Sequence, residues 1–379
     1  MAKPFFVLSP CGTSVLTNAT DPDLRNVINR HSNAKTEDEV RQASIEEHRR
    51  IADHLTAARQ RMTAADHADA QKISAELNGI LSLYDGNCGG RKSDFHQLLC
   101  TDTWLGEESA KCVQEWLKGN GLVAELRRQP DLRTKELAAF HSALSDLVEW
   151  CEKEIDPWRQ SRHVVFNLTG GFKSIQGFLQ TLAQFYADET VYIFETGPEL
   201  LRLPRLPLRM AADETVKEHL SIFRRLSLGL NVPPEDTNCI PETLRMNLDG
   251  QACLSPWGDL VWAQTKKTIY AEKVHAVEGL TSLLAFGNDF DRSVADLEKT
   301  RVAMVNERID DLVRHLEKRS QDGKGHNPPS LDFKQLRGNP SSPSTHECDA
   351  WSDQDAKRLF GHFDTEGRFL LDRLDKALH

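Results

Sequence analysis

The stretch Arg162-His-Val-Val-Phe-Asn-Leu-Thr-Gly-Gly-Phe-Lys173 decides the fold class of this chain. Its apolar, β-branched first half predicts a strand, and its two glycines predict a turn into a helix that continues over residues 174–186. Thr190-Val-Tyr-Ile-Phe-Glu195 then predicts the next strand. Strands that alternate with helices in this way are typical of a parallel sheet covered by helices.

The same alternation extends towards the N-terminus. We expect strands at residues 4–9 and 121–126 and helical stretches at residues 36–83 and 134–154. The first strand ends in the loop Pro10-Cys-Gly-Thr-Ser14, and the first helical stretch begins with a capping box at Thr36-Glu-Asp-Glu39. The alternation therefore predicts an α/β domain with a parallel, doubly wound sheet. A proline-punctuated segment, residues 200–210, leads out of it.

The sequence changes character after about residue 210. Residues 211–278 carry several prolines and predict a small connecting module. Residues 279–379 predict an α+β domain in which helices pack on a small antiparallel sheet. The expected elements are strands near residues 282–286, 331–336, 345–351, 358–363 and 368–374, and a helical pattern over residues 290–319.

Composition limits the classes of protein to which the chain can belong. It has 379 residues, 39% of them hydrophobic, and no apolar run long enough for a membrane span, so we expect no membrane partner. The short apolar start does not fit a signal peptide, which predicts a cytoplasmic protein. Eight cysteines without a Cys-x-x-Cys pair predict neither a metal site nor a disulfide framework. A net charge of −10 argues against a general nucleic-acid coat, because neutralising phosphates needs excess Lys and Arg.

Two loops at predicted strand ends have the chemistry of an anion site. In open α/β sheets, ligands bind outside the carboxyl ends of the strands. Lys173 opposes the dipole of its own helix, and a bound phosphate would remove that penalty. Either loop alone fits a tight turn with a solvated lysine equally well, whereas both together favour a ligand that carries phosphate. The candidate residues are Gly12, Thr13, Ser14 and Asn18 in the first loop, and Asn167, Thr169, Gly170, Gly171 and Lys173 in the second.

Three motifs resemble the CARF domains of CRISPR-associated proteins. They are Ser9-Pro-Cys-Gly-Thr-Ser14 with Thr17-Asn18, Asn167-Leu-Thr-Gly-Gly-Phe-Lys173, and Leu203-Pro-Arg-Leu-Pro207. The resemblance covers about residues 1–210 and is most specific at residues 167–173. It implies an α/β, Rossmann-like domain over residues 1–210, with a helical insertion after its first loop. This domain would be a homodimeric sensor that binds a cyclic oligoadenylate, with cyclic tetra-adenylate as the expected ring, across its two-fold axis. It also implies that the nine candidate residues hold the ring, which acts as an allosteric activator. No cofactor is expected. We expect Cys11 to be a packing residue.

The C-terminal segment carries the residue types that cleave RNA without a metal. Such cleavage needs a base for the ribose 2′-OH, cations for the charge on phosphorus and an acid for the leaving oxygen. Residues 330–379 contain seven Lys and Arg, together with several His, but also nine Asp and Glu. An ordinary charged surface therefore stays an alternative for each residue taken singly.

This segment resembles the RelE family of ribosome-dependent mRNA interferases. The similar stretches are Leu331-Asp-Phe-Lys-Gln-Leu-Arg-Gly-Asn339, Thr345-His-Glu347, Lys357-Arg-Leu-Phe360 and Gly367-Arg-Phe-Leu-Leu-Asp-Arg373. The resemblance implies that His346 and His379 are the acid–base partners, with Lys376 as a further candidate. It implies phosphate-handling cations at Lys334, Arg337, Arg358 and Arg373. One departure is the lack of a tyrosine after Tyr270, because many relatives place an aromatic residue near the C-terminus, and His362 is expected to face solvent or core.

The two resemblances together imply a type III CRISPR ancillary effector. In such a protein, ring binding to the CARF dimer activates metal-independent cleavage of mRNA on the ribosome by 2′-OH attack, which inhibits translation in antiviral defence. Three other interpretations stay open. A HEPN ribonuclease would use the Arg373–His379 spacing, a PD-(D/E)xK nuclease would use Asp332-Phe-Lys334 with a metal and with Asp311 or Asp322, and a non-enzymatic regulator would read DNA through residues 211–278.

Overall fold

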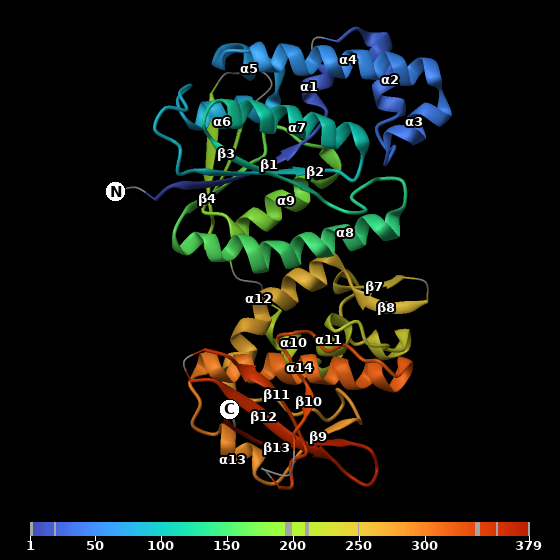
Figure 1. The fold of residues 1–379 in the computed structure, drawn as a ribbon, viewed down its shortest axis with the longest axis vertical. Helices are drawn as coiled ribbons and strands as arrows, with labels where there is room; N and C mark the ends of the chain where they lie inside the picture. Colours follow the sequence, from blue (N-terminus) through green and yellow to red (C-terminus); the bar gives the residue numbers. More distant parts are fainter. Residues whose placement is uncertain are drawn as a thin grey trace. The chain divides into compact units, whose positions relative to one another are not determined.

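The structure is a computed structural model that describes residues 3–18, 20–193, 199–208, 212–248, 250–337, 342–353 and 355–377 (Figure 1). It divides the chain into two compact units, Met1–Arg209 and Met210–His379. The expected boundary at residue 278 therefore falls inside the second unit. His379, one of the candidate acid–base residues, lies outside the described residues.

A six-stranded sheet forms the centre of the first unit, and it confirms an α/β fold with a mainly parallel sheet. Its strand order is β3-β2-β1-β4-β5-β6. The first five strands are parallel, and β6 runs antiparallel to β5. The strands are β1 (Phe5–Cys11), β2 (Phe95–Cys100), β3 (Val123–Arg128), β4 (His163–Asn167), β5 (Glu189–Ile193) and β6 (Leu200–Pro204).

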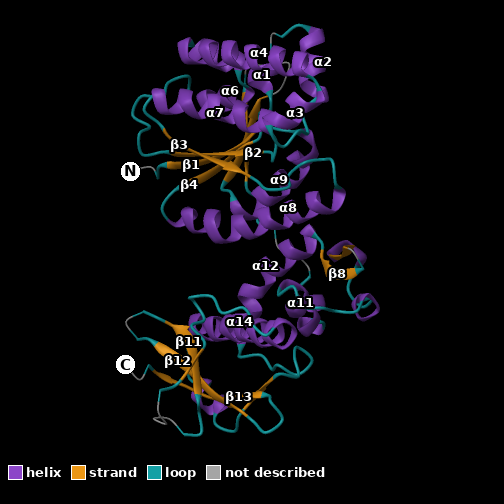
Figure 2. Ribbon diagram, turned by 45° about the vertical axis from the view of Figure 1, so that its right-hand side comes forward, coloured by secondary structure: helices purple, strands orange, loops and turns teal. Residues whose placement is uncertain are grey.

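Helices cover both faces of this sheet, as a Rossmann-like arrangement requires (Figures 1 and 2). Helices α6 (Ala75–Leu83) and α7 (Trp104–Gly119) lie on one face, and α8 (Leu137–Trp150) and α9 (Lys173–Tyr186) lie on the other (Figure 1). The insertion forms a further layer over α6 and α7. It consists of α2 (Pro22–Arg30), α3 (Glu37–Ala43), α4 (Ile45–Ala64) and α5 (His67–Ile73).

The long helical stretch expected at residues 36–83 is four separate helices, α3 to α6. Each begins at a side chain that caps its first turn, and Thr36 is the first of these, as predicted. Ser44, Asp66 and Ser74 cap the next three helices by accepting from backbone N–H groups. Such caps favour extended backbone at the cap residue, which interrupts the helix at each one.

Strands β2 and β6 were not expected from the sequence. β2 carries His96 and Gln97 in its middle, which shortens its apolar run. His96 is nevertheless buried, where its Nε2 lies 3.1 Å from the Tyr84 hydroxyl, and burial lowers the pKa of His96 to about 3. β6 ends on Pro204 at the sheet edge, where proline is tolerated because no further ladder bond is needed.

The second unit contains a five-stranded sheet with the order β10-β11-β12-β13-β9. All neighbours are antiparallel except β9, which runs parallel to β13. The long helix α14 (Lys299–Asp322) shares one apolar core with the sheet, and α13 (Phe290–Val294) also belongs to this core. The strands are β9 (Leu284–Phe286), β10 (Lys334–Gln335), β11 (His346–Trp351), β12 (Lys357–Phe363) and β13 (Phe369–Lys376), close to the predicted segments.

Residues 212–272 of this unit form a helical module with its own core. Its members include Phe223 and Trp262, whose rings stack 6.2 Å apart. A two-stranded hairpin completes the module. The elements are α10 (Asp213–Glu218), α11 (Leu220–Ser227), the short helices Pro234–Thr237 and Glu242–Leu244, β7 (Arg245–Leu248), β8 (Gln251–Leu254) and α12 (Pro256–Glu272).

A buried ion pair fixes this module to α14. The Arg224 side chain on α11 is only 1% exposed, and its Nη2 lies 2.6 Å from Asp310 Oδ1 on α14. Arg224 Nε donates to the same oxygen, and the hydroxyl of Tyr270 on α12 donates to the other. Asn306, one turn before Asp310, donates to the carbonyls of Tyr270 and Lys273. The module is therefore held on α14 by polar contacts that leave little freedom of orientation.

Removing one partner of this pair should destabilise the second unit strongly. Asp310→Asn leaves a guanidinium buried without its counter-charge, and such losses reach about 3–5 kcal/mol of unfolding free energy. Urea unfolding followed by circular dichroism measures the change. The double variant Arg224→Met/Asp310→Leu is the control and should lose less than Asp310→Asn. Equal stability of Asp310→Asn and the wild type would contradict a structural role for the pair.

Candidate functional site

The first candidate site lies where the strand order of the first unit reverses. β1 and β4 are neighbours at the centre of the sheet, and their following helices lie on opposite faces. The loops after these strands are in close contact. A Cβ placed on Gly12 would lie only 2.9 Å from the carbonyl oxygen of Gly171. Crevices of this kind bind ligands in open α/β sheets. The structure thus brings the two predicted loops together.

A carboxylate from α6 fills the space between these loops. Glu76 is fully buried in the first turn of α6, and its two oxygens accept from both loops. Oε1 accepts from Gly12 N at 2.9 Å and from Gly171 N at 3.3 Å. Oε2 accepts from Ser14 Oγ at 2.6 Å and from Ser74 Oγ at 2.8 Å. The backbone donors expected to hold a phosphate are therefore bonded to the chain's own anion.

The glycines of these loops are needed for close approach. A Cβ on Gly170 would lie 2.4 Å from Glu76 Oε1, and Gly171 has a φ of 102°, which favours glycine. Gly79 on α6 has the same role from the other side, because a Cβ there would lie 2.0 Å from Asn167 Oδ1. These contacts place α6 directly on the carboxyl end of β4.

Asn167 and Thr169 are turned towards α6. Asn167 is fully buried and donates to Ser9 Oγ at 3.1 Å and to the Glu76 carbonyl at 3.0 Å. Thr169 Oγ1 is buried without a hydrogen-bond partner, and it would lie 2.5 Å from a Cβ at Gly79. Both side chains therefore support the contact between β4 and α6 in this structure.

Other candidates in this crevice are open to solvent. Lys173 is exposed in the first turn of α9, and Thr13 is half-buried before α1 (Ser14–Thr17). Asn18 is exposed and donates to the Ile73 carbonyl at 3.1 Å, at the C-terminus of α5. Cys11 is fully buried beneath the loop, and burial raises the pKa of its thiol, which fits a packing residue.

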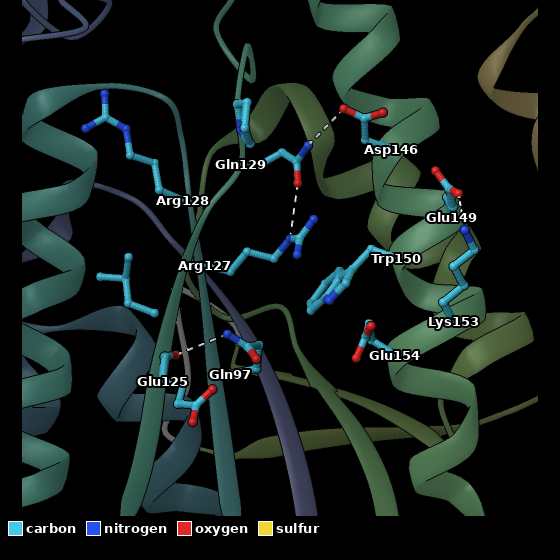
Figure 3. Close-up of a pocket in the computed structure, with 12 residues that line it drawn as sticks. Gln97, Glu125, Arg127, Arg128, Gln129, Asp146, Glu149, Trp150, Lys153 and Glu154 are labelled. Atoms are coloured by element: carbon cyan, nitrogen blue, oxygen red, sulfur yellow. Dashed lines mark hydrogen bonds and ion pairs between the residues drawn. The ribbon is translucent and has the colours of Figure 1, made fainter. Parts of the chain in front are cut away.

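A separate polar hollow of about 740 Å³ lies between β3 and α8 (Figure 3). The Arg127 guanidinium lies over the Trp150 ring at 4.5 Å, and Arg127 Nε donates to Gln129 Oε1. Burial raises the pKa of Asp146, and the neighbouring Glu149 raises it further. None of the predicted site residues lines this hollow.

The second candidate site is the sheet of the second unit. Leu359 and Phe363 of β12 pack into the core shared with α14, so Arg358, Phe360 and His362 face the opposite side. This side is called here the open face, although Phe360 itself is fully buried. Arg373 of β13 pairs with Phe360, and its guanidinium lies 5.6 Å from that ring. The open face therefore carries Arg358 and Arg373, and strand register places Lys334 there as well, because Lys334 pairs with Glu347 and Glu347 pairs with Phe360.

Carboxylates neutralise the most buried of these cations. Arg358 pairs with Asp332 at 2.7 Å, Glu347 at 2.8 Å and Asp349 at 2.6 Å. Lys334 pairs with Asp332 at 2.5 Å, and its strand register places it opposite Glu347. A hollow of about 210 Å³ lies beside this cluster. Its lining is Lys334, Glu347, Asp349, Trp351, Ser352, Ala356, Arg358 and Ala377.

His346 lies on the other side of the sheet. Its ring stacks on Phe333 at 5.3 Å and meets Phe363 and Phe369 edge-on, all of which belong to the α14 side. Partial burial lowers the pKa of His346, and Arg319 on α14 lowers it further. The structure therefore does not bring His346 to the open face with Arg358.

The remaining candidates are spread along the sheet. Lys376 pairs with Lys357, whose ammonium lies 5.9 Å from the Trp351 ring, so the register places Lys376 on the α14 side. Arg337 follows β10 and is exposed. Among the residues that the structure describes, no three His, Cys, Asp or Glu side chains are placed to hold a metal ion.

The comparison with protein families covers only part of the chain. Residues 71–206 match the sequence model of a family described as CRISPR-associated protein (Cas_APE2256). This match includes Glu76 and the loop after β4. A comparison with curated proteins finds no match. Across the described part of the chain, every helix is too short or too polar to cross a membrane.

Removal of the Glu76 carboxylate should destabilise the first unit. Glu76→Ala leaves two backbone N–H groups and two hydroxyls without their acceptor, and hydrogen bonds to a charged group contribute about 1.5–3 kcal/mol each. We expect a loss of about 3 kcal/mol or more in urea unfolding of the full chain. Glu76→Gln is the matched control, because it keeps the shape and one acceptor oxygen and should lose less. Wild-type stability of Glu76→Ala would show that the crevice does not depend on this carboxylate.

Proposed function

We propose that the chain is a type III CRISPR ancillary effector, a ribonuclease switched on by a cyclic oligoadenylate. The observation that carries this proposal is the meeting of the two predicted loops at the crevice between β1 and β4, inside a segment that matches a CRISPR-associated family. The resemblance of residues 1–210 to CARF domains supplies the ligand class. The resemblance of the C-terminal segment to RelE supplies the reaction.

The crevice suits a phosphate-bearing ring that competes with Glu76. Lys173 is exposed beside the loops and offers a positive charge, and Thr13 offers a hydroxyl. Glu76 bonds to the Gly12 and Gly171 amides, so a phosphate gains these donors only when the carboxylate moves. A homodimer would present two such crevices to a symmetric ring. Ring binding is then coupled to the position of α6.

The open face of the second sheet suits RNA bound by a larger partner. Arg373 offers a guanidinium for the phosphorane and lies 3.5 Å from the Asp375 carboxylate, whereas Arg358 and Lys334 lie closer to theirs, at 2.7 and 2.5 Å from Asp332. A surface so neutralised binds phosphates weakly by itself. We therefore propose that the ribosome holds the mRNA and that the protein supplies the groups that cleave it by 2′-OH attack, without a metal.

Cleavage of mRNA by the purified full chain tests the function. We expect cutting only when both ribosomes and a cyclic oligoadenylate are present, with cyclic tetra-adenylate the most active among cyclic tri-, tetra- and hexa-adenylate, and with EDTA without effect. Ring-dependent cutting of free RNA would favour a HEPN-type nuclease instead. Loss of cutting in EDTA would favour a metal-dependent nuclease, and specific, salt-sensitive binding of duplex DNA without cleavage would favour a regulator.

Ring affinity tests the crevice separately from the reaction. Lys173→Ala should weaken binding of cyclic tetra-adenylate about 10-fold, because a charge-assisted contact contributes about 1.5 kcal/mol or more. Glu76→Gln should strengthen binding several-fold, since the competing negative charge is gone. Isothermal calorimetry measures both. Unchanged affinity in both variants would place the ring elsewhere, and Lys153→Ala, in the hollow beside β3, is the control that should bind normally.

A further inference from the structure

His362 and Asp372 form a hydrogen-bonded pair on the open face of the second sheet. His362 Nδ1 lies 2.9 Å from Asp372 Oδ2, and the Oγ of buried Ser344 donates to the same oxygen at 2.7 Å. The His362 side chain is 25% exposed, and that of Asp372 is 12% exposed. The carboxylate is thus largely shielded, while the imidazole reaches solvent.

A β-bulge aims the aspartate at the histidine. Phe360 pairs with Arg373, and the next residue of β12, Gly361, pairs with Leu371. Asp372 therefore has no partner across the ladder and is the extra residue of the bulge. Bulges of this kind re-aim a side chain and are common beside active sites. Without this extra residue, the alternation along β13 would direct either Asp372 or Arg373 away from the open face.

The hydrogen bond determines which ring nitrogen can accept a proton. A carboxylate only accepts hydrogen bonds, so Nδ1 of His362 is the nitrogen that carries the hydrogen. Nε2 of the neutral ring is then the basic atom. An imidazole oriented by a carboxylate in this way is the arrangement that serves general base catalysis in hydrolytic enzymes.

Arg373 lies within reach of the same space. It faces the open side opposite Phe360, two residues from His362 along β12. Residues related in this diagonal way on adjacent strands lie about 7–8 Å apart, which a long side chain can bridge. His346, in contrast, stacks among aromatic rings on the α14 side. The open face is therefore the side of the sheet where a base and a cation occur together.

We propose that His362, rather than His346, is the general base of the ribonuclease, with Asp372 as its positioning residue. This proposal rests on the proposed function. Nε2 of His362 takes the proton of the ribose 2′-OH, and the 2′-oxygen attacks phosphorus while the bond from phosphorus to the 5′-oxygen breaks. The 5′-oxygen leaves with a proton from water, and the imidazolium returns its proton to the hydroxide so formed. The products are a 2′,3′-cyclic phosphate and a 5′-hydroxyl.

Single-turnover cleavage of ribosome-bound mRNA, with ring present, tests the assignment. His362→Gln should slow cleavage about 100-fold or more, as loss of a general base does, with an unchanged unfolding midpoint. The acid limb that a histidine base gives to the pH–rate profile should disappear. His346→Gln is the matched control and should keep both rate and limb. Asp372→Asn should slow cleavage about 10-fold or more, in line with loss of an orienting partner.

Chemical rescue separates a catalytic from a structural role. Added imidazole should restore part of the cleavage rate of His362→Ala, which no structural defect would allow. Cleavage by His362→Gln at the wild-type rate, or loss of the limb in His346→Gln instead, would overturn this assignment alone. Absence of cleavage by the wild-type protein with ring and ribosomes would overturn the proposed function, and this assignment with it.

Discussion

The carboxylate of Glu76 is the contact on which the first unit's crevice depends. It lies in the first turn of α6, where the helix dipole favours a negative charge, and it accepts hydrogen bonds from the loops after β1 and β4. Two loops rich in backbone donors would otherwise face each other without an acceptor. Glycines at positions 170 and 171 permit the approach that this contact needs. The same contact ties α6 to the loops at the end of the sheet, so any anion that enters the crevice acts on α6 as well as on the loops.

The sequence predicts the parallel sheet and the two loops, because these follow from local patterns. The strand, Gly-Gly turn and helix around residues 162–186 are read from apolar residues and glycines alone, and β4 and α9 lie there. Glu76 is not predictable in this way. It is 64 residues from Gly12 and 95 from Gly171, and only the folding of the intervening chain brings it to them. β2 is missed for a related reason, since the buried polar His96 looks like a surface residue in sequence.

In the second unit, strand positions are predictable but the faces of the sheet are not. The sequence predicts all five strands of the sheet within a few residues. A list of candidates chosen by residue type, in contrast, mixes residues from both faces of the sheet. His346 and Arg358 are on adjacent strands, but strand alternation places them on opposite sides. The bulge at Asp372 shifts the alternation of side chains between the two faces by one residue. Neither the residue types nor their spacing in the sequence predicts this bulge. Pairing register, which is a property of two strands together, decides which groups can act on one substrate.

Under the proposed function, the electrostatics of the open face explain how an acidic chain serves an RNA substrate. Arg358 is surrounded by three carboxylates, which hold it in place but cancel its attraction for phosphate. Binding of RNA through phosphate neutralisation depends on uncompensated cations, and this face has few to offer. We expect such a protein to bind free RNA weakly. On the ribosome, another surface already holds the backbone of the proposed mRNA substrate. The protein then needs to add only a base and a cation. Under the proposed function, the weak charge of the face therefore limits the reaction to substrates that a partner presents.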